Sequence, residues 1–142
     1  MAAATSAAAT EPATTLALQG EVCTGVGEGA GFVQLPWVRR EFSAKLGFEP
    51  YPGTFNLRLD GAEWEAARAR LAAEPGIAIV PQPGFCAARC FRVVIAGQVT
   101  GAAVLPEVPD YPADKLEIVS AVPVRRTLGL ADGDRVSVSL VC

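Results

Sequence analysis

The chain has 142 residues, 51% of them hydrophobic and 19% charged, which suits one domain with a single core and is too short to divide in two. Its net charge of −3 argues against a nonspecific nucleic-acid surface, which needs clustered Lys and Arg. The chain contains no histidine, which excludes a Ser-His-Asp triad, a Cys-His pair and histidine-ligated zinc.

The N-terminal segment is predicted to be a disordered tail. Residues 1–15 are mostly Ala and Thr, with one proline and no basic residue. Secretory signals begin with positive charge and mitochondrial presequences are rich in arginine, so this segment resembles neither. No apolar stretch of about 18 residues follows, so we expect no membrane span. The sequence therefore predicts one domain over residues 16–142, in the cytoplasm.

The first predicted strand, residues 16–23, is followed by a run in which glycine alternates with other residues. The run comprises Gly25, Val26, Gly27, Glu28, Gly29, Ala30 and Gly31. Glycine adopts positive φ without steric cost, so such a run can turn several backbone N–H groups toward the phosphates of a nucleotide. It has neither the Gly-Lys-Ser/Thr ending of a P-loop nor the dinucleotide fingerprint. By itself it is also consistent with a flexible hairpin loop.

Two short helices are predicted next along the chain. In residues 36–46 an apolar stripe recurs at helical spacing, and residues 61–73 consist of strong helix formers. Trp37 and Trp64 lie on the apolar sides of these helices, so we expect them to pack in the core and not to stack on bases.

Between the two helices, residues 52–60 alternate in the manner of a strand. The alternation places Thr54, Asn56 and Arg58 on one face and hydrophobic residues on the other. Mg²⁺ prefers oxygen ligands and shares substrate phosphates, so one or two protein oxygens suffice. The Thr54 hydroxyl and the Asn56 amide meet that need. An ordinary strand with a polar outer face is the alternative.

The rest of the chain is mainly strands. Residues 77–80, 86–95, 99–105, 115–121 and 135–141 are β-branched or alternating runs separated by Gly, Pro and Asp. Many short strands with one or two helices indicate a small β-barrel. Asp132 and Asp134 are explained by the turn before the last strand.

Four cysteines are present and form no CxxC motif: Cys23, Cys86, Cys90 and Cys142. Cys86 and Cys90 could bind a metal or form a disulfide, but buried free thiols are the expected state. Free thiols fit a reducing cytoplasm.

Four segments, residues 25–29, 46–57, 116–119 and 125–136, resemble in order and spacing the CTP-dependent riboflavin kinases best known from archaea. The similarity extends over nearly all of residues 16–141. Four segments in register arise by chance far less readily than any one of them.

The resemblance implies a mainly β fold, a small six-stranded barrel of the cradle-loop type. It implies transfer of the γ-phosphoryl group of CTP to the 5′-hydroxyl of riboflavin, giving FMN and CDP. The glycine run from Gly25 to Gly31 falls on the nucleotide-binding loop, and Thr54 and Asn56 fall on the Mg²⁺ ligands. Glu117 falls on a flavin-contacting glutamate. The stretch that closes over the nucleotide corresponds to Val122, Pro123, Val124 and Arg125.

The chain departs from the family pattern at several of these places. Ala30 and Gly31 replace larger residues, and Phe55 replaces a leucine between the two metal ligands. Pro109 stands where the family carries a flavin-contacting threonine, and proline has neither an N–H nor a hydroxyl. A related acceptor alcohol is therefore an alternative to riboflavin.

Phosphoryl transfer needs no histidine, because it relies on positioning and on electrostatic stabilisation. In this interpretation Arg125 supplies positive charge, and Glu117 orients the acceptor hydroxyl or holds the flavin. Two other functions remain open: a non-catalytic barrel that binds nucleotide or flavin, and a barrel-type DNA-binding regulator, which the acidic composition disfavours. The sequence leaves the nucleotide preference and the oligomeric state open.

Overall fold

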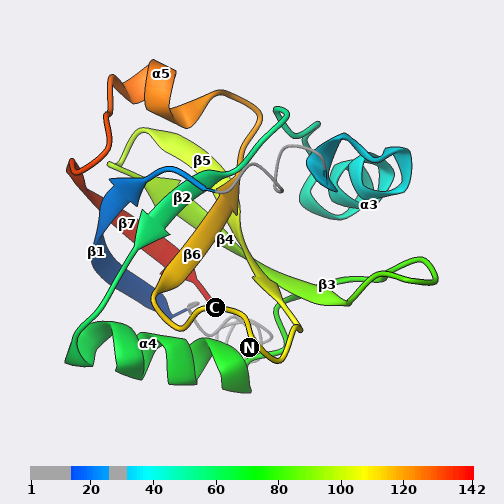
Figure 1. Cartoon of the computed structure of the whole chain (residues 1–142), viewed down its shortest axis with the longest axis horizontal. Coiled ribbons are helices and arrows are strands. Elements are labelled where there is room, and N and C mark those ends of the chain that lie inside the picture. Colours follow the sequence, from blue (N-terminus) through cyan, green and yellow to red (C-terminus); the bar gives the residue numbers. More distant parts are fainter. Residues whose placement is uncertain (1–13, 26–31) are drawn as a thin grey trace, which may run out of the picture.

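The computed structural model describes residues 14–25 and 32–142. In this part of the chain seven strands form one antiparallel sheet in the order β3-β4-β5-β6-β2-β1-β7, and β4 also pairs with β7. Six strands therefore close into a ring, and β3 extends the sheet outward from β4 (Figure 1). The mainly β, six-stranded barrel expected from the sequence is confirmed.

The elements in chain order are β1 (Thr15–Cys23), α3 (Pro36–Leu46), β2 (Phe55–Arg58), α4 (Ala62–Ala73), β3 (Ile77–Ile79), β4 (Ala88–Ile95), β5 (Val99–Pro106), β6 (Lys115–Val119), α5 (Val124–Leu128) and β7 (Arg135–Val141). Helix α5 was not predicted, because five residues are too few to show a helical period. Strand β1 starts at Thr15, where it pairs with Val141. Most of the predicted tail, residues 1–13, lies outside the described residues.

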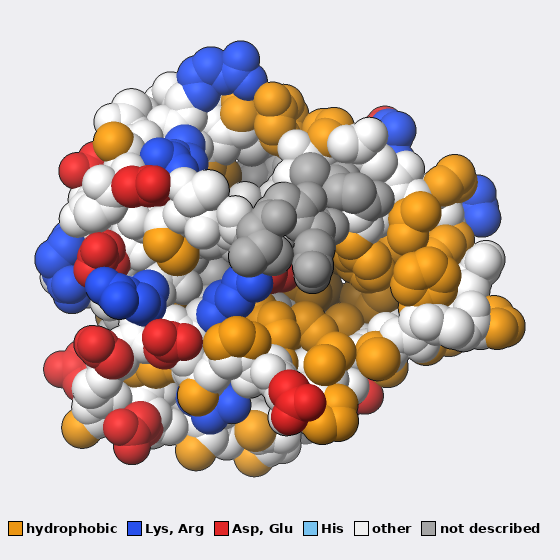
Figure 2. Space-filling view, viewed as in Figure 1, with side chains coloured by type: hydrophobic (Ala, Val, Ile, Leu, Met, Phe, Trp, Pro, Cys, Tyr) orange, Lys and Arg blue, Asp and Glu red, His pale blue; other side chains and the backbone are white. Residues whose placement is uncertain are grey.

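Two helices cover different parts of the barrel. Helix α4 lies across one end, where the Trp64 indole N–H donates to the Ala113 carbonyl at 2.8 Å. Helix α3 packs Val38 and Phe42 against hydrophobic residues of β4, β5 and β6 on the outer face. Hydrophobic side chains gather on the side of the molecule toward α3, and charges of both signs are interspersed over the barrel (Figure 2). Both tryptophans, Trp37 included, are buried as expected.

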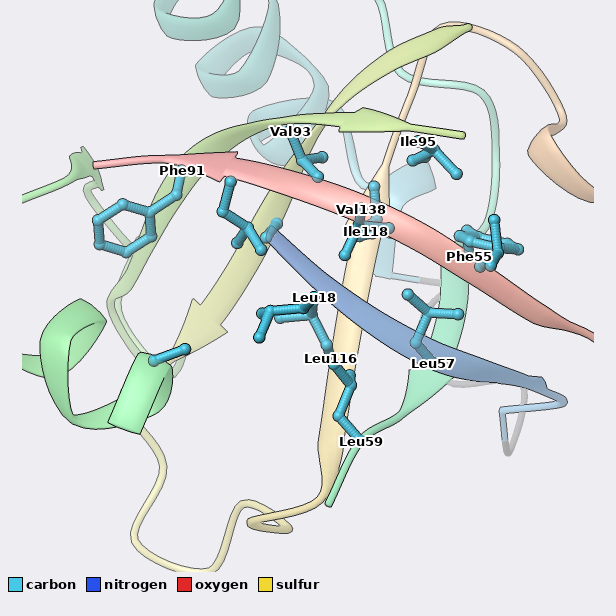
Figure 3. Packing of buried hydrophobic residues seen from close by; sticks show 14 of the residues in the cluster. Leu18, Phe55, Leu57, Leu59, Phe91, Val93, Ile95, Leu116, Ile118 and Val138 are labelled. Carbon is cyan, nitrogen blue, oxygen red and sulfur yellow. The ribbon is translucent and has the colours of Figure 1, made fainter. Parts of the chain in front are cut away.

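The barrel interior is filled by the inward-facing residues of its strands (Figure 3). The side chains drawn and labelled there are Leu18, Phe55, Leu57, Leu59, Phe91, Val93, Ile95, Leu116, Ile118 and Val138. Burying one such side chain contributes about 1.5–3 kcal/mol, so this core is a major source of the hydrophobic stabilisation. Because alternate strand residues point outward, the core fixes which polar side chains of β2 and β6 reach the outer face.

All four cysteines are free thiols. Cys90 is buried, as predicted, and burial raises the pKa of its thiol to about 12. Cys86 is exposed, so the prediction that both thiols are buried is wrong for that residue; it precedes the start of β4. None of the helices in the described residues combines the length and hydrophobicity needed to cross a membrane.

Candidate functional site

The start of strand β2 and the residue before it place two neutral oxygen donors next to each other. Phe55 and Leu57 point into the barrel core, and Thr54 and Asn56 lie on the opposite face, as the alternation predicted. The Thr54 hydroxyl donates to Asn56 Oδ1 at 3.4 Å, and Asn56 Nδ2 donates to the Thr54 carbonyl at 3.1 Å. The second contact fixes the carboxamide so that its oxygen lies on the side of the hydroxyl. Asn56 is 8% exposed, which makes it one of the few buried polar residues.

This pair fits a small, hard cation. Two oxygens bound at about 2.1 Å and at right angles on Mg²⁺ lie about 3 Å apart, slightly closer than the Thr54 and Asn56 oxygens. The described residues contain no group of three or more His, Cys, Asp or Glu side chains that could hold a metal. A cation here would therefore rest on neutral protein oxygens and take its charge compensation from a bound phosphate.

Gly25, the first residue of the glycine run, packs against this carboxamide. A Cβ built on Gly25 would lie 2.8 Å from Asn56 Nδ2, closer than real Cβ atoms come, and 3.1 Å from Asn56 Cγ, which is a tight contact. A side chain at Gly25 would therefore force the Asn56 carboxamide to shift, and this contact links the glycine run to the predicted metal ligands. The other residues of the run, Val26 to Gly31, lie outside the described residues.

A cleft of about 150 Å³ opens beside Thr54. Its walls come from the turn before β2 and from the segment between β6 and α5. The lining residues are Tyr51, Pro52, Gly53, Thr54, Phe55, Ile118, Ser120, Val122, Pro123, Val124 and Arg125. The structure thus brings Thr54 together with the whole predicted closing stretch. Tyr51 and Ser120 were missed, because no local pattern marks an exposed tyrosine or a buried serine as site residues.

Arg125 is held at this cleft by a contact that the sequence analysis missed. Its Nη1 lies 2.8 Å from Asp132 Oδ1 and donates to the Thr24 hydroxyl at 3.4 Å. The Thr24 hydroxyl donates to both Asp132 carboxylate oxygens, at 2.9 and 2.8 Å. Asp132 is therefore more than a turn former. Only the fold reveals this, because Asp132 lies 108 residues from Thr24 in the sequence.

Glu117 lies directly opposite Asn56 in the pairing of β2 with β6. Directly opposed residues of an antiparallel pair share one face, so the Glu117 side chain is a neighbour of the carboxamide. Its carboxylate forms a 2.8 Å ion pair with Lys115 and is 18% exposed. This pair keeps a negative charge beside the site with its counterion in place.

Pro109 lies elsewhere. It lines a cavity of about 760 Å³ between α4 and the loop from β5 to β6, together with Tyr111 and Lys115, and neither Thr54 nor Glu117 lines that cavity. Lys115, which lines this cavity and pairs with Glu117, lies between the two predicted flavin contacts, Pro109 and Glu117. The Tyr111 hydroxyl is enclosed and has no hydrogen-bond partner among the described residues. Burial, and then the charge of Glu117, raises the pKa of this phenol.

Comparisons with known proteins agree with one another. A family model named for CTP-dependent riboflavin kinases, and described as "Domain of unknown function DUF120", matches residues 22–140. The chain is 44% identical over 131 residues to the riboflavin kinase of Archaeoglobus fulgidus. The aligned region covers 89% of this chain and 55% of that protein. The chain is 43% identical over 130 residues to the riboflavin kinase of Pyrobaculum calidifontis (87% and 59%) and 38% identical over 129 residues to that of Methanosarcina barkeri (88% and 56%). The chain therefore spans less than two thirds of the length of these relatives.

Proposed function

The chain belongs to the family of CTP-dependent riboflavin kinases, and from this premise we propose that it transfers the γ-phosphoryl group of CTP to the 5′-hydroxyl of riboflavin. The products are FMN and CDP. The resemblance drawn from four short sequence segments is confirmed at the level of the family. Because the relatives are longer than this chain, the activity, substrates and site residues are parts of the proposal.

The observation that carries the proposal is the convergence of separate chain segments on one face of the barrel. Thr54 and Arg125 line one cleft, Asn56 packs against Gly25, and Glu117 stands opposite Asn56. These segments meet because β2 pairs with β1 on one side and with β6 on the other. A phosphoryl-transfer site needs a phosphate cradle, oxygen donors for a cation, a fixed positive charge and a group that orients the acceptor, and these residues supply each of them.

On the nucleotide side, we assign phosphate binding to the backbone N–H groups of residues 25–31 and to the stretch Val122, Pro123, Val124 and Arg125. Thr54 and Asn56 would hold the cation, for which we propose Mg²⁺. When bound, Mg²⁺ neutralises charge on the terminal phosphates. Arg125 adds donors in a fixed plane, which suits phosphate oxygens.

On the acceptor side, Glu117 accepts a hydrogen bond from the 5′-hydroxyl and directs its oxygen toward the γ-phosphorus. A new P–O bond forms to this oxygen, the bond between the γ-phosphorus and the oxygen that bridges to the β-phosphate breaks, and CDP leaves. The hydroxyl proton passes to the carboxylate or to water. The Lys115 ammonium, 2.8 Å from the carboxylate, limits the repulsion between Glu117 and the phosphates.

Pro109 favours a second candidate function, a barrel that binds nucleotide or flavin without turnover. Proline cannot donate a hydrogen bond, and Pro109 lines a cavity separate from the cleft at Thr54. A flavin contact is assigned to Pro109 only through the resemblance, so the acceptor side is where the two candidates differ.

We also propose that the protein acts on small molecules and binds neither nucleic acid nor a membrane surface. The net charge is negative, and charges of both signs are interspersed on the face seen in Figure 2. The free cysteines fit a cytoplasmic location, which we also propose.

The test is to incubate the protein with riboflavin, Mg²⁺ and one of CTP, ATP or GTP, and to separate FMN from riboflavin by chromatography. FMN formed with CTP, and more slowly with the purine nucleotides, is the expected result. Saturable binding of CTP or riboflavin without FMN would replace the kinase with the binding module. Absence of both would refute the assignment of the site.

A further inference from the structure

The turn between α5 and β7 connects two parts of the proposed nucleotide site. The Asp132 carboxylate accepts hydrogen bonds from the Thr24 hydroxyl and forms the ion pair with Arg125. Thr24 is followed directly by Gly25, which packs against the Asn56 carboxamide. The Asp132 carboxylate thus joins the start of the glycine run to the Arg125 guanidinium on α5.

We propose that Asp132 is a positioning residue that holds Arg125 and Thr24 in the geometry that receives the nucleotide phosphates. This inference rests on the proposed nucleotide site. Both described polar contacts of Arg125 use Nη1, so its other guanidinium N–H groups are available to a phosphate. An arginine already fixed by a carboxylate loses less side-chain freedom when the phosphate binds.

The turn itself does not depend on the Asp132 side chain. Asp134 Oδ2 accepts a hydrogen bond from the Ala131 backbone N–H at 2.8 Å. The Gly133 N–H donates to the Val22 carbonyl, and the Val22 N–H donates to the Asp134 carbonyl, each at 2.8 Å. These contacts fix the turn on β1. Within the described part of the chain, the Asp132 carboxylate contacts the Thr24 and Arg125 side chains.

The ion pair is too exposed to be explained by fold stability. The Arg125 and Asp132 side chains are 39% and 59% exposed, and pairs this open add little to stability. Asp132 also repels a bound phosphate, but two unit charges about 8 Å apart in water change an affinity only about twofold. Loss of an ordered, charge-assisted hydrogen bond weakens binding by about tenfold or more. Positioning therefore outweighs repulsion.

The experiment compares two aspartates of the same turn. Binding of CDP with Mg²⁺ is measured by calorimetry without riboflavin, and KM values for CTP and riboflavin are measured separately. Asp132→Asn is expected to weaken CDP binding and raise KM for CTP about tenfold, with KM for riboflavin unchanged. Asp134→Asn is the matched control and should leave all three values unchanged.

A double-mutant cycle separates positioning from a general loss of structure. In the Arg125→Ala background, Asp132→Asn should weaken CDP binding by no more than about threefold, because the part of its effect that acts through the guanidinium is lost and the part that acts through Thr24 remains. Thr24→Val, which removes one hydroxyl, is expected to weaken CDP binding about threefold and gives an independent readout if Asp132→Asn unfolds the protein.

An unchanged or tighter CDP affinity in Asp132→Asn would overturn the inference, as would a full tenfold loss in the Arg125→Ala background. A wild-type protein that binds CDP but forms no FMN would overturn the proposed activity and leave the role of Asp132 standing. A wild-type protein that binds no nucleotide would overturn both.

Discussion

The nucleotide side and the acceptor side of the proposed site are built differently. On the nucleotide side, short contacts join Gly25, Asn56 and Thr54, and a second set joins Thr24, Asp132 and Arg125. On the acceptor side, the two residues expected to contact the flavin are separated: Glu117 stands beside Asn56, and Pro109 lines another cavity. A site whose parts contact one another is preorganised, so the nucleotide side should tolerate substitution less.

The largest effect is expected from the two oxygen donors at the start of β2, Thr54 and Asn56. Asn56→Ala and Thr54→Ala each should lower the rate of FMN formation at limiting Mg²⁺ by at least about 100-fold, because each removes one of the two protein oxygens offered to the cation. Asn56→Ala also loses a hydrogen bond to the Thr54 carbonyl, worth about 1 kcal/mol, so the fold should survive. Initial rates over a Mg²⁺ series, with thermal melting in parallel, measure both effects.

Arg58→Ala is the matched control. Arg58 extends from the same face of β2, where it pairs with Glu21, and contacts neither donor in the structure. Its rate should stay within about twofold of wild type, since its exposed ion pair with Glu21 adds little and leaves both oxygen donors untouched. Wild-type turnover in either oxygen-donor variant would show that the cation is held elsewhere.

A smaller effect is expected where the glycine run meets the carboxamide. Gly25→Ala would place a Cβ 2.8 Å from Asn56 Nδ2, so the carboxamide must move away from Thr54. We expect the Mg²⁺ concentration for half-maximal rate to rise about tenfold, the size of effect typical when a ligand loses its supporting contact. A Mg²⁺ titration of the rate measures this.

Gly47→Ala is the control, because its added Cβ should strain the backbone without touching Asn56. Gly47 caps α3 with φ of +82°, and a Cβ there meets nothing within 4 Å. This substitution should lower the free energy of unfolding by about 1 kcal/mol through backbone strain and leave the Mg²⁺ dependence unchanged. If the two glycine variants have the same Mg²⁺ dependence, the contact between Gly25 and Asn56 has no part in metal binding.

The acceptor side is expected to respond more weakly, and in the direction of improvement. Pro109→Thr restores a hydroxyl donor, and one added hydrogen bond of about 0.5–1.5 kcal/mol lowers KM for riboflavin about two- to tenfold, with KM for CTP unchanged. Pro106→Thr is the control, because Pro106 lines the same cavity at the end of β5. If Pro109→Thr and Pro106→Thr change KM for riboflavin equally, Pro109 does not belong to the acceptor site.

The same contrast explains which features the sequence could predict. The alternation of β2 repeats every second residue, so Thr54 and Asn56 could be placed on one face from local sequence, and the structure agrees. The role of Asp132 depends on contacts across more than 100 residues, which no local pattern contains. The separation of Pro109 from Glu117 depends on the path of the loop from β5 to β6, and composition does not determine that path.

The smallest effect concerns how firmly this loop is held, and Tyr111 reports it. Burial raises the pKa of its phenol, with the negative charge of Glu117 as the next cause, so the folded state favours the neutral form. The stability that the neutral phenol gives to the folded state is fully present below the pKa of an unfolded tyrosine, about 10, and is lost as the pH rises through the raised pKa of Tyr111. In the Tyr51→Phe variant Tyr111 is the remaining tyrosine. Ultraviolet absorbance should detect its phenolate at a higher pH in the folded protein than in the same protein unfolded in urea. Coincident titrations would mean that the loop carrying Pro109 opens readily, and the contrast between the two sides would then be one of mobility and not of residue placement.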